Sequence, residues 1–326
     1  MARPVNRAAA PRVKPAQRPS HPPRVAHSLY PVRYVPRMRL GYLTHVTGPA
    51  GPAAAYRDTV AAAVAAEEHG FDTFWVAQHH ADEARGLLPS PLVLLAAVAT
   101  ATSRLRLGTG VVAAPLEDPM RLAEDAAVVD ALSGGRLELG VGAGADAAAS
   151  AAFGRVHTDR HDDTVALLDT LRTILRGPRL VPAAPDVAHR LWWATGSTPS
   201  VDAAAARGMG LITGRPTDVP GSPVAADLAR YWSRAVGVPR VAVSRIVSAG
   251  EPAADVVARL RRDPALGWAT ELVVQTTPGG AGLTTHVATM RAVADVVAPA
   301  LGARRADRRT DRRPAPAAPA SAAGRP

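Results

Sequence analysis

A regular alternation of short apolar runs and alanine-rich segments constrains the fold of this chain more than any other feature. The runs that we expect to be β-strands lie at 38–44, 72–77, 105–112, 136–141, 190–195, 209–213, 240–247 and 270–276. They are apolar almost throughout, which is typical of parallel strands buried on both faces, and a helical segment follows each of them. Eight such units predict a closed (β/α)8 TIM barrel, with an open doubly wound sheet as the alternative.

Proline and glycine indicate where the helices begin and end. Ser90, Asp118, Thr198 and Ser222 each precede a proline, so we expect each to be an N-cap whose side-chain oxygen accepts from a free backbone amide. A glycine with left-handed backbone often ends a helix. The glycines expected to do so are Gly70, Gly134, Gly135 and Gly208.

The formal charge of +10 is concentrated in the two terminal segments. Residues 1–37 contain eight basic and no acidic residues, and 303–326 contain seven basic and two acidic residues, so residues 38–302 carry a net charge of −3. Both segments are rich in Ala, Pro and Arg and poor in large apolar side chains, which predicts disorder. We therefore expect a disordered tail over 1–37, the barrel over 38–302 and a second disordered tail over 303–326. RNA binding by these tails is a less favoured interpretation.

Composition excludes several classes of site. The chain contains no cysteine, so disulfides, thiolate metal sites and cysteine nucleophiles are ruled out. No apolar run reaches the ~18 residues of a membrane span, and the N-terminal segment lacks the apolar stretch of a secretory signal. We expect a cytoplasmic protein that does not contact a membrane.

Residues with chemical potential follow four of the expected strands. In a barrel, the C-terminal strand ends form the catalytic mouth. His79 and His80 follow the second strand and 109–112 ends the third, while 142–144 and 195–198 follow the fourth and the fifth. We expect these four sets to meet at one rim.

The two adjacent histidines admit three interpretations: metal ligands, a proton relay, or polar residues of an ordinary loop. Neighbouring residues on extended backbone point to opposite sides and rarely bind one ion. No third ligand follows at recognisable spacing, although Asp82 and Glu83 are near. We therefore expect no metal here.

Two further loops could approach a cofactor. Gly142-x-Gly144-x-x-Ala147 formally matches a dinucleotide fingerprint, but no strand ending in an acid follows about 20 residues later, so we favour a loop that admits a flat ring or a phosphate. The segment 196–198 precedes a helical stretch, whose free amides and dipole attract phosphate. A plain N-cap is the alternative.

The segments GFDTFWVAQHH, LPSP, SGGRLELGVGAG and LWWATGS, in this order, resemble the bacterial-luciferase-like flavin-dependent monooxygenases, in particular an FMN-dependent subgroup. The resemblance extends from Met38 to Leu301. It implies a TIM barrel that binds reduced FMN at its C-terminal rim, reacts with O2 and oxygenates a small organic substrate. It also implies a transient flavin reductase as partner and a homodimer.

Site residues follow from the same resemblance. His79 matches the first histidine of the family's pair, which would move a proton or stabilise the oxygenated flavin. A cis peptide of the family maps onto the Gly110–Val111 bond, and Trp75, Leu43 and Val112 are expected to line the pocket. The expected cofactor-binding residues are Thr109, Gly110, Val111, Gly142, Ala143, Gly144, Thr195, Gly196 and Ser197.

One position departs from the pattern. Some members hold the phosphate with an arginine where this chain has Ala143. The phosphate would then depend on the helix dipole, on hydroxyl groups and on Arg215. The alternatives are an F420-dependent oxidoreductase of the same fold and a non-catalytic flavin-binding protein.

Overall fold

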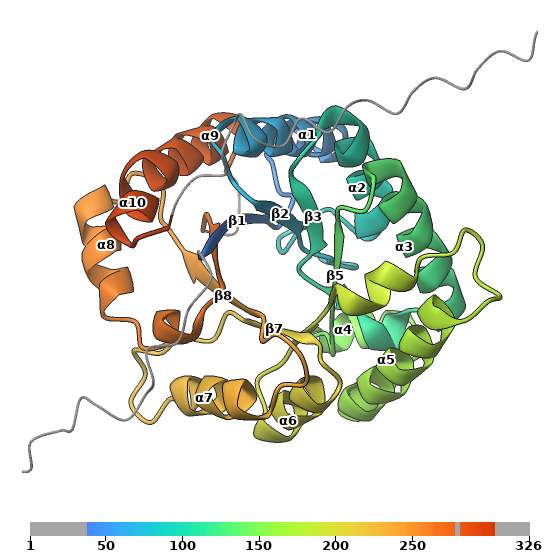
Figure 1. Ribbon diagram of the computed structural model, residues 1–326. Coiled ribbons are helices and arrows are strands. Elements are labelled where there is room, and N and C mark those ends of the chain that lie inside the picture. Colours follow the sequence, from blue (N-terminus) through green and yellow to red (C-terminus); the bar gives the residue numbers. More distant parts are fainter. Residues whose placement is uncertain (1–37, 278–280, 304–326) are drawn as a thin grey trace, which may run out of the picture. The chain divides into compact units, whose positions relative to one another are not determined.

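Parallel pairing joins the strands of the described part of the chain into one closed sheet. The structure is a computed structural model that describes residues 38–277 and 281–303; apart from Ala303, the two tails expected at the termini lie outside these residues. The strands run in the order β3-β2-β1-β9-β8-β7-β6-β5-β4, and β3 also pairs with β5, which closes the ring. Figure 1 shows this ring with the helices around it. The TIM barrel prediction is confirmed, and the open sheet is wrong.

Each strand overlaps one of the apolar runs of the sequence. The strands are β1 (Arg39–Thr44), β2 (Thr73–Val76), β3 (Arg106–Thr109), β4 (Val112–Ala113), β5 (Leu137–Gly142), β6 (Leu191–Ala194), β7 (Gly210–Thr213), β8 (Val241–Ile246) and β9 (Glu271–Gln275). Both faces of these strands are covered, by the helices outside and by side chains inside the ring, which is why the runs show no alternation.

The third run is interrupted, contrary to the single strand expected over 105–112. It forms β3 and β4, and the peptide bond between Gly110 and Val111 is cis, as the resemblance implies. At the interruption the hydroxyl of Thr109 donates to the carbonyl oxygen of Gly140 at 2.7 Å and accepts from the Gly140 amide at 2.9 Å. This side chain therefore joins β3 to β5 where the ladder of backbone hydrogen bonds stops.

Helices follow the strands around the outside of the ring. They are α1 (Pro52–Glu68), α2 (Pro91–Ala101), α3 (Pro119–Ser133), α4 (Ala147–Ala152), α5 (Arg160–Arg176), α6 (Thr198–Ala206), α7 (Val224–Arg234), α8 (Ala253–Arg261), α9 (Leu283–Ala292) and α10 (Ala298–Ala300). The left-handed glycines expected at helix ends are confirmed, with φ of 80°, 67°, 85° and 65° at Gly70, Gly134, Gly135 and Gly208.

Two of the four expected N-caps are confirmed by position. Asp118 precedes α3 and accepts from the amides of Met120 and Arg121, while Ser90 precedes α2 without a side-chain bond. The other two are wrong. Ser197 is the N-cap of α6, because Thr198 donates to Asp227 at 2.8 Å instead. Likewise α7 follows Pro223, because the Ser222 hydroxyl donates to the carbonyl oxygen of Pro216.

Apolar side chains fill the space inside the ring and the layer outside it. The inner cluster consists of Leu43, Trp75, Trp192, Ala242 and Val273. The outer layer, between strands and helices, contains fully buried leucines such as Leu107, Leu137 and Leu139. The barrel is therefore a packed core and not a channel.

Charged side chains close the barrel at the end where the strands begin. Glu138 and Glu271 are only 3% and 0% exposed. Arg39 contacts both carboxylates, with nitrogen to oxygen distances of 3.3 Å to Glu138 and 2.6 Å to Glu271. The other partners of the two carboxylates are Arg106, Arg240, Thr73, Trp75 and Trp192. We call this cluster the barrel floor, since it leaves the opposite, C-terminal end for ligands.

Candidate functional site

The strand register places the expected site residues side by side along the rim. Val76 of β2 pairs with Thr109 of β3, Ala113 of β4 with Gly142 of β5, and Gly142 with Ala194 of β6. The segments that follow these residues are therefore neighbours. The four sets taken from the sequence lie in one arc, as expected.

A hollow of about 210 Å³ opens at the beginning of this arc, and we call it the histidine pocket. Six residues that the sequence analysis expected at the rim line it, namely His79, His80, Gly110, Val111, Ala143 and Gly144. Residues that the sequence analysis did not single out line it too: His45, Gln78, Arg85, Asp146 and Ser150.

Other expected residues lie outside the histidine pocket. Thr109 is buried in the barrel wall with its hydroxyl engaged. Gly142 lies beneath the pocket, where an added Cβ would approach Val111 to 2.8 Å. Thr195, Gly196 and Ser197 lie farther along the rim. The expected lining residues are also elsewhere: Leu43 and Trp75 are in the inner cluster and Val112 is in the outer layer.

A chain of hydrogen bonds runs from His79 across the rim. His79 Nε2 lies 2.8 Å from His45 Nδ1, and His45 Nε2 lies 2.8 Å from the side-chain oxygen of Gln275. That oxygen can only accept, so His45 donates from Nε2 and, when neutral, accepts at Nδ1 from His79. Nδ1 is then the unprotonated nitrogen of His79, and the chain fixes its tautomer.

Burial keeps both imidazoles neutral near pH 7. Burial, reinforced by His45 and Arg85, lowers the pKa of His79 from 6.5 to about 4, against the opposing effect of Asp82 and Asp146. The pKa of His45 is lowered by burial too, although its hydrogen bond to Gln275 opposes the shift. Neutral His79 can accept a proton.

The backbone around the histidines is held in unusual conformations. Val46 and Ala81, which follow His45 and His80, have φ of 53° and 56°, a left-handed region that non-glycine residues rarely adopt. The His79 amide donates to the carbonyl oxygen of Leu88 at 3.0 Å. The left-handed residues and this hydrogen bond constrain the backbone from which the imidazoles project.

His80 has surroundings different from those of His79. Its ring lies edge-on to Phe153 at 4.8 Å, and its buried Nε2 has no hydrogen-bond partner among the described residues. Burial lowers its pKa. Over the described residues, no three His, Asp or Glu side chains are grouped so that they could hold a metal ion.

The segment 195–198, which follows β6 along the arc, leads into helix α6. Ser197 is its N-cap, and the Ser197 hydroxyl lies 2.9 Å from that of Ser200. Arg215, which follows β7, donates to the carbonyl oxygen of Gly196 at 2.6 Å. A guanidinium, hydroxyls and helix amides therefore meet beside Thr195.

Sequence reasoning missed His45 and Gln275. His45 directly follows β1, and Gln275 ends β9. Examining the ends of all eight expected strands, instead of four, would have included both residues. Their contact with each other depends on barrel closure, which joins β1 to β9.

Comparison with known proteins identifies the family. A family model described as luciferase-like monooxygenase matches residues 38–324. The 4-hydroxyprotoasukamycin monooxygenase of Streptomyces nodosus subsp. asukaensis is 36% identical over 120 residues, which are 37% of this chain and 32% of that protein. The oxygenase component of the flavin-dependent trigonelline monooxygenase of Acinetobacter baylyi is 40% identical over 80 residues, 24% of this chain and 22% of that protein. The aligned regions thus span about a fifth to a third of the length of these curated relatives.

Solved structures share the fold at low sequence identity. Monooxygenase RslO1 from Streptomyces bottropensis has a TM-score of 0.69 and 22% identity, over 80% of this chain and 99% of that chain. The oxygenating constituent of 3,6-diketocamphane monooxygenase from Pseudomonas putida, in complex with FMN, has 0.61 and 17%, over 81% and 98%. An F420-dependent secondary alcohol dehydrogenase has 0.63 and 13%, over 81% and 99%. With its barrel, its rim and the match over 38–324, this chain belongs to the luciferase-like monooxygenase family.

Proposed function

We propose that this protein is the oxygenase component of a two-component monooxygenase, which uses reduced FMN and O2 to oxygenate a small organic substrate. The observation that carries the proposal is that His79, with its lowered pKa, lines the same pocket as Gly110 and Val111. The similarity to an enzyme described as an oxygenase component supports a separate reductase as the source of reduced flavin.

The arc has the residue types that a phosphorylated flavin requires. A volume of about 210 Å³ is below the ~300–1,000 Å³ of ordinary small-molecule sites, so the histidine pocket would hold one edge of the ring system. Next to the histidine pocket, small residues leave room along the rim. Gly144 has φ of 68°, which favours glycine, and an added Cβ there would lie only 3.3 Å from Ala113. The flavin would continue from Ala143 along the open rim.

The phosphate would lie at the start of α6. Thr195, Gly196 and Ser197 would offer hydroxyls and helix amides, and Arg215 would supply the positive charge that Ala143 lacks. Arg215 already contacts Gly196 and lies 3.9 Å from Asp227, so it is fixed beside this position.

Bound reduced flavin supplies the electrons for the reaction with O2. The protein would contribute a fixed proton acceptor, because neutral His79 has its free lone pair on Nδ1 and its Nε2 is held by His45. Gln275 in turn would hold His45, and burial of the pair limits access of water.

An F420-dependent hydride transfer is the second candidate, since the same fold occurs in an F420-dependent dehydrogenase. The two functions differ in their reaction with oxygen. Only the monooxygenase should accelerate or redirect oxidation of reduced FMN by O2.

The test mixes the purified protein with FMN, reduced FMN and F420 separately and measures binding by fluorescence and re-oxidation of reduced FMN by absorbance. We expect tight binding of reduced FMN and a change in its re-oxidation rate of about 100-fold in His79→Ala, the scale of one proton-transfer group. His161→Ala, in an exposed histidine of α5, is the control. Binding of F420 alone would favour the second candidate, and FMN binding without any effect of His79→Ala would indicate a non-catalytic flavin protein.

A further inference from the structure

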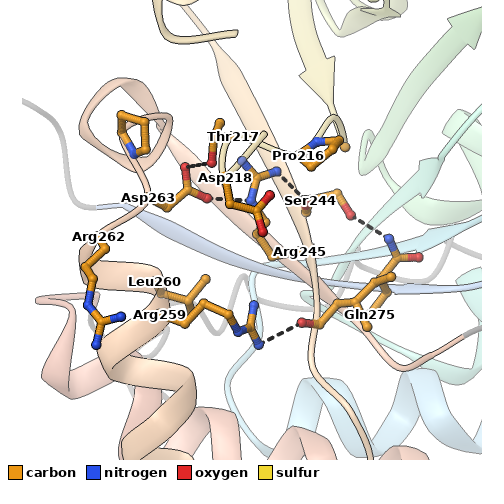
Figure 2. A pocket seen from close by; sticks show the side chains of 13 residues that line it. Pro216, Thr217, Asp218, Ser244, Arg245, Arg259, Leu260, Arg262, Asp263 and Gln275 are labelled. Atoms are coloured by element: carbon orange, nitrogen blue, oxygen red, sulfur yellow. Dashed lines mark hydrogen bonds and ion pairs between the residues drawn. The ribbon is translucent and has the colours of Figure 1, made fainter. Parts of the chain in front are cut away.

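A second and larger cavity lies on the same rim, next to the strand ends that the proposed flavin site leaves free. It has a volume of about 630 Å³, within the usual range for small-molecule sites. Gly214 after β7, Ser244 and Arg245 of β8 and Gln275 of β9 contribute to its walls. Figure 2 shows Ser244, Arg245 and Gln275 together with Arg259 and Arg262 at the end of α8. We call it the arginine cavity.

Arg245 is the unusual residue of the arginine cavity, because it is a charged side chain that is only 9% exposed. Its Nε lies 2.5 Å from a carboxylate oxygen of Asp263, and its Nη1 donates to the carbonyl oxygen of Ser244 at 2.7 Å. Its Nη2 is buried and has no hydrogen-bond partner among the described residues. A buried donor without an acceptor is costly, and one oxygen of a ligand would remove that cost.

Asp263 cannot supply this acceptor, because its carboxylate is already in use. Besides Arg245, it accepts from the Thr217 hydroxyl at 2.7 Å and from the Ala265 amide at 2.9 Å. Figure 2 shows the dashed lines that join the Asp263 carboxylate to Thr217 and to Arg245. The carboxylate therefore orients the guanidinium through Nε and leaves Nη2 without an acceptor.

The other charged side chains of the cavity differ in their pairing and in their exposure to solvent. Arg259 is paired with Glu251 at 2.9 Å, whereas Arg262 makes no ion pair with any described residue. Asp218 is an exposed carboxylate in the lining, so water and salt screen its repulsion of an anion. Arg245 is paired with Asp263 and Arg259 with Glu251, so the preference of the cavity for an anionic group depends on the unpaired Nη2 donor of Arg245 and on the charge of Arg262.

The arginine cavity is connected to the histidine pocket through one residue, Gln275. Gln275 lines the cavity, its amide nitrogen lies 3.2 Å from the Ser244 hydroxyl, and its oxygen accepts from His45. His45 in turn lines the histidine pocket and contacts His79. A molecule in the cavity would therefore lie against the same hydrogen-bonded chain that fixes the tautomer of His79.

We infer that the arginine cavity is the substrate site, and that the substrate is a small organic acid whose carboxylate binds the free Nη2 of Arg245. Arg262 would assist from the cavity mouth. A planar guanidinium with a free nitrogen suits a carboxylate oxygen better than an ammonium does. That the bound acid is a substrate rests on the proposed function. Binding of an anion in the cavity does not require flavin.

The test titrates the full chain, without flavin, with benzoate and with benzamide, its uncharged counterpart, and measures binding by calorimetry. We expect benzoate to bind about tenfold or more tightly, the scale of one charge-assisted hydrogen bond. Arg245→Lys retains a cation beside Asp263 but has no second planar nitrogen, so benzoate affinity should fall about tenfold while benzamide affinity stays the same.

A second variant, which is expected to raise benzoate affinity instead of lowering it, tests the inference without changing the buried Arg245. Asp218→Asn removes an exposed like charge and should raise benzoate affinity by about two- to fivefold at low salt. Asp125→Asn, an exposed carboxylate of α3, is the control and should change nothing.

Several results would overturn the inference. They are equal affinity for benzoate and benzamide, absence of saturable benzoate binding, and unchanged benzoate affinity in both Arg245→Lys and Asp218→Asn. Competition between FMN and benzoate would also overturn it, by assigning the cavity to the phosphate of the cofactor. Failure of FMN binding alone would count against the proposed function and leave the anion site standing.

Discussion

Replacing Gly86 with alanine should displace His79 without changing any side chain to which the proposed function gives a chemical role. An added Cβ would lie 2.4 Å from the carbonyl oxygen of His45 and 2.5 Å from Cδ2 of His79. Carbon atoms in contact stay ~3.5–4.0 Å apart, so the imidazole must move by about 1 Å, because the backbone carbonyl of His45 is less free to yield. That movement would stretch the 2.8 Å bond between the two histidines beyond hydrogen-bond distance.

The expected cost has two parts. Overpacking contributes about 1–3 kcal/mol and the lost hydrogen bond about 1 kcal/mol, so the free energy of unfolding in urea should fall by about 2–4 kcal/mol. A misplacement of about 1 Å at a reacting group should slow the flavin reaction by up to about 100-fold. Gly267→Ala is the matched control, since its Cβ would meet nothing within 4 Å. If Gly86→Ala unfolds at the same urea concentration as Gly267→Ala and NMR still shows the bond between His45 and His79, the reasoning is wrong.

Three further predictions concern stability and protonation. Glu138→Gln should lower the free energy of unfolding in urea by about 3–5 kcal/mol, because it leaves the arginines of the barrel floor without their shared carboxylate; a loss below about 1 kcal/mol would contradict this. Asp118→Ala should cost about 1 kcal/mol and Ser90→Ala much less, since only Asp118 makes a cap hydrogen bond, and equal losses would refute that difference. His79 should titrate near pH 4 by NMR; because its pKa is lowered on folding, its contribution to stability is present above pH ~6.5 and is lost as the pH falls towards 4, so a midpoint near 6.5 would argue against its burial.

The sequence predicted the barrel well because the pattern on which it depends is local. Each apolar run is buried on both faces by neighbouring strands and helices, so the run itself contains the information. The cis bond between Gly110 and Val111 was placed by resemblance to the family and not by periodicity.

Features that depend on contacts between distant residues were harder to predict. The two N-caps failed because the hydroxyls of Thr198 and Ser222 bind partners outside their own helix ends. His45 and Gln275 are 230 residues apart in the chain, and only ring closure brings them together. The sequence analysis did not identify Arg245 as a binding residue, because the reason to do so is one unpaired nitrogen, Nη2, which no sequence pattern reveals.

The barrel floor limits where small molecules can enter and leave the barrel. Two tryptophans and a network of paired charges block the lower end, and the cylinder above them is packed solid. Small molecules that reach the histidines therefore have to approach from the C-terminal end of the barrel and not through its interior. Under the proposed function, oxidised flavin and product would both leave at this end, and the slower of the two departures would limit the rate of turnover.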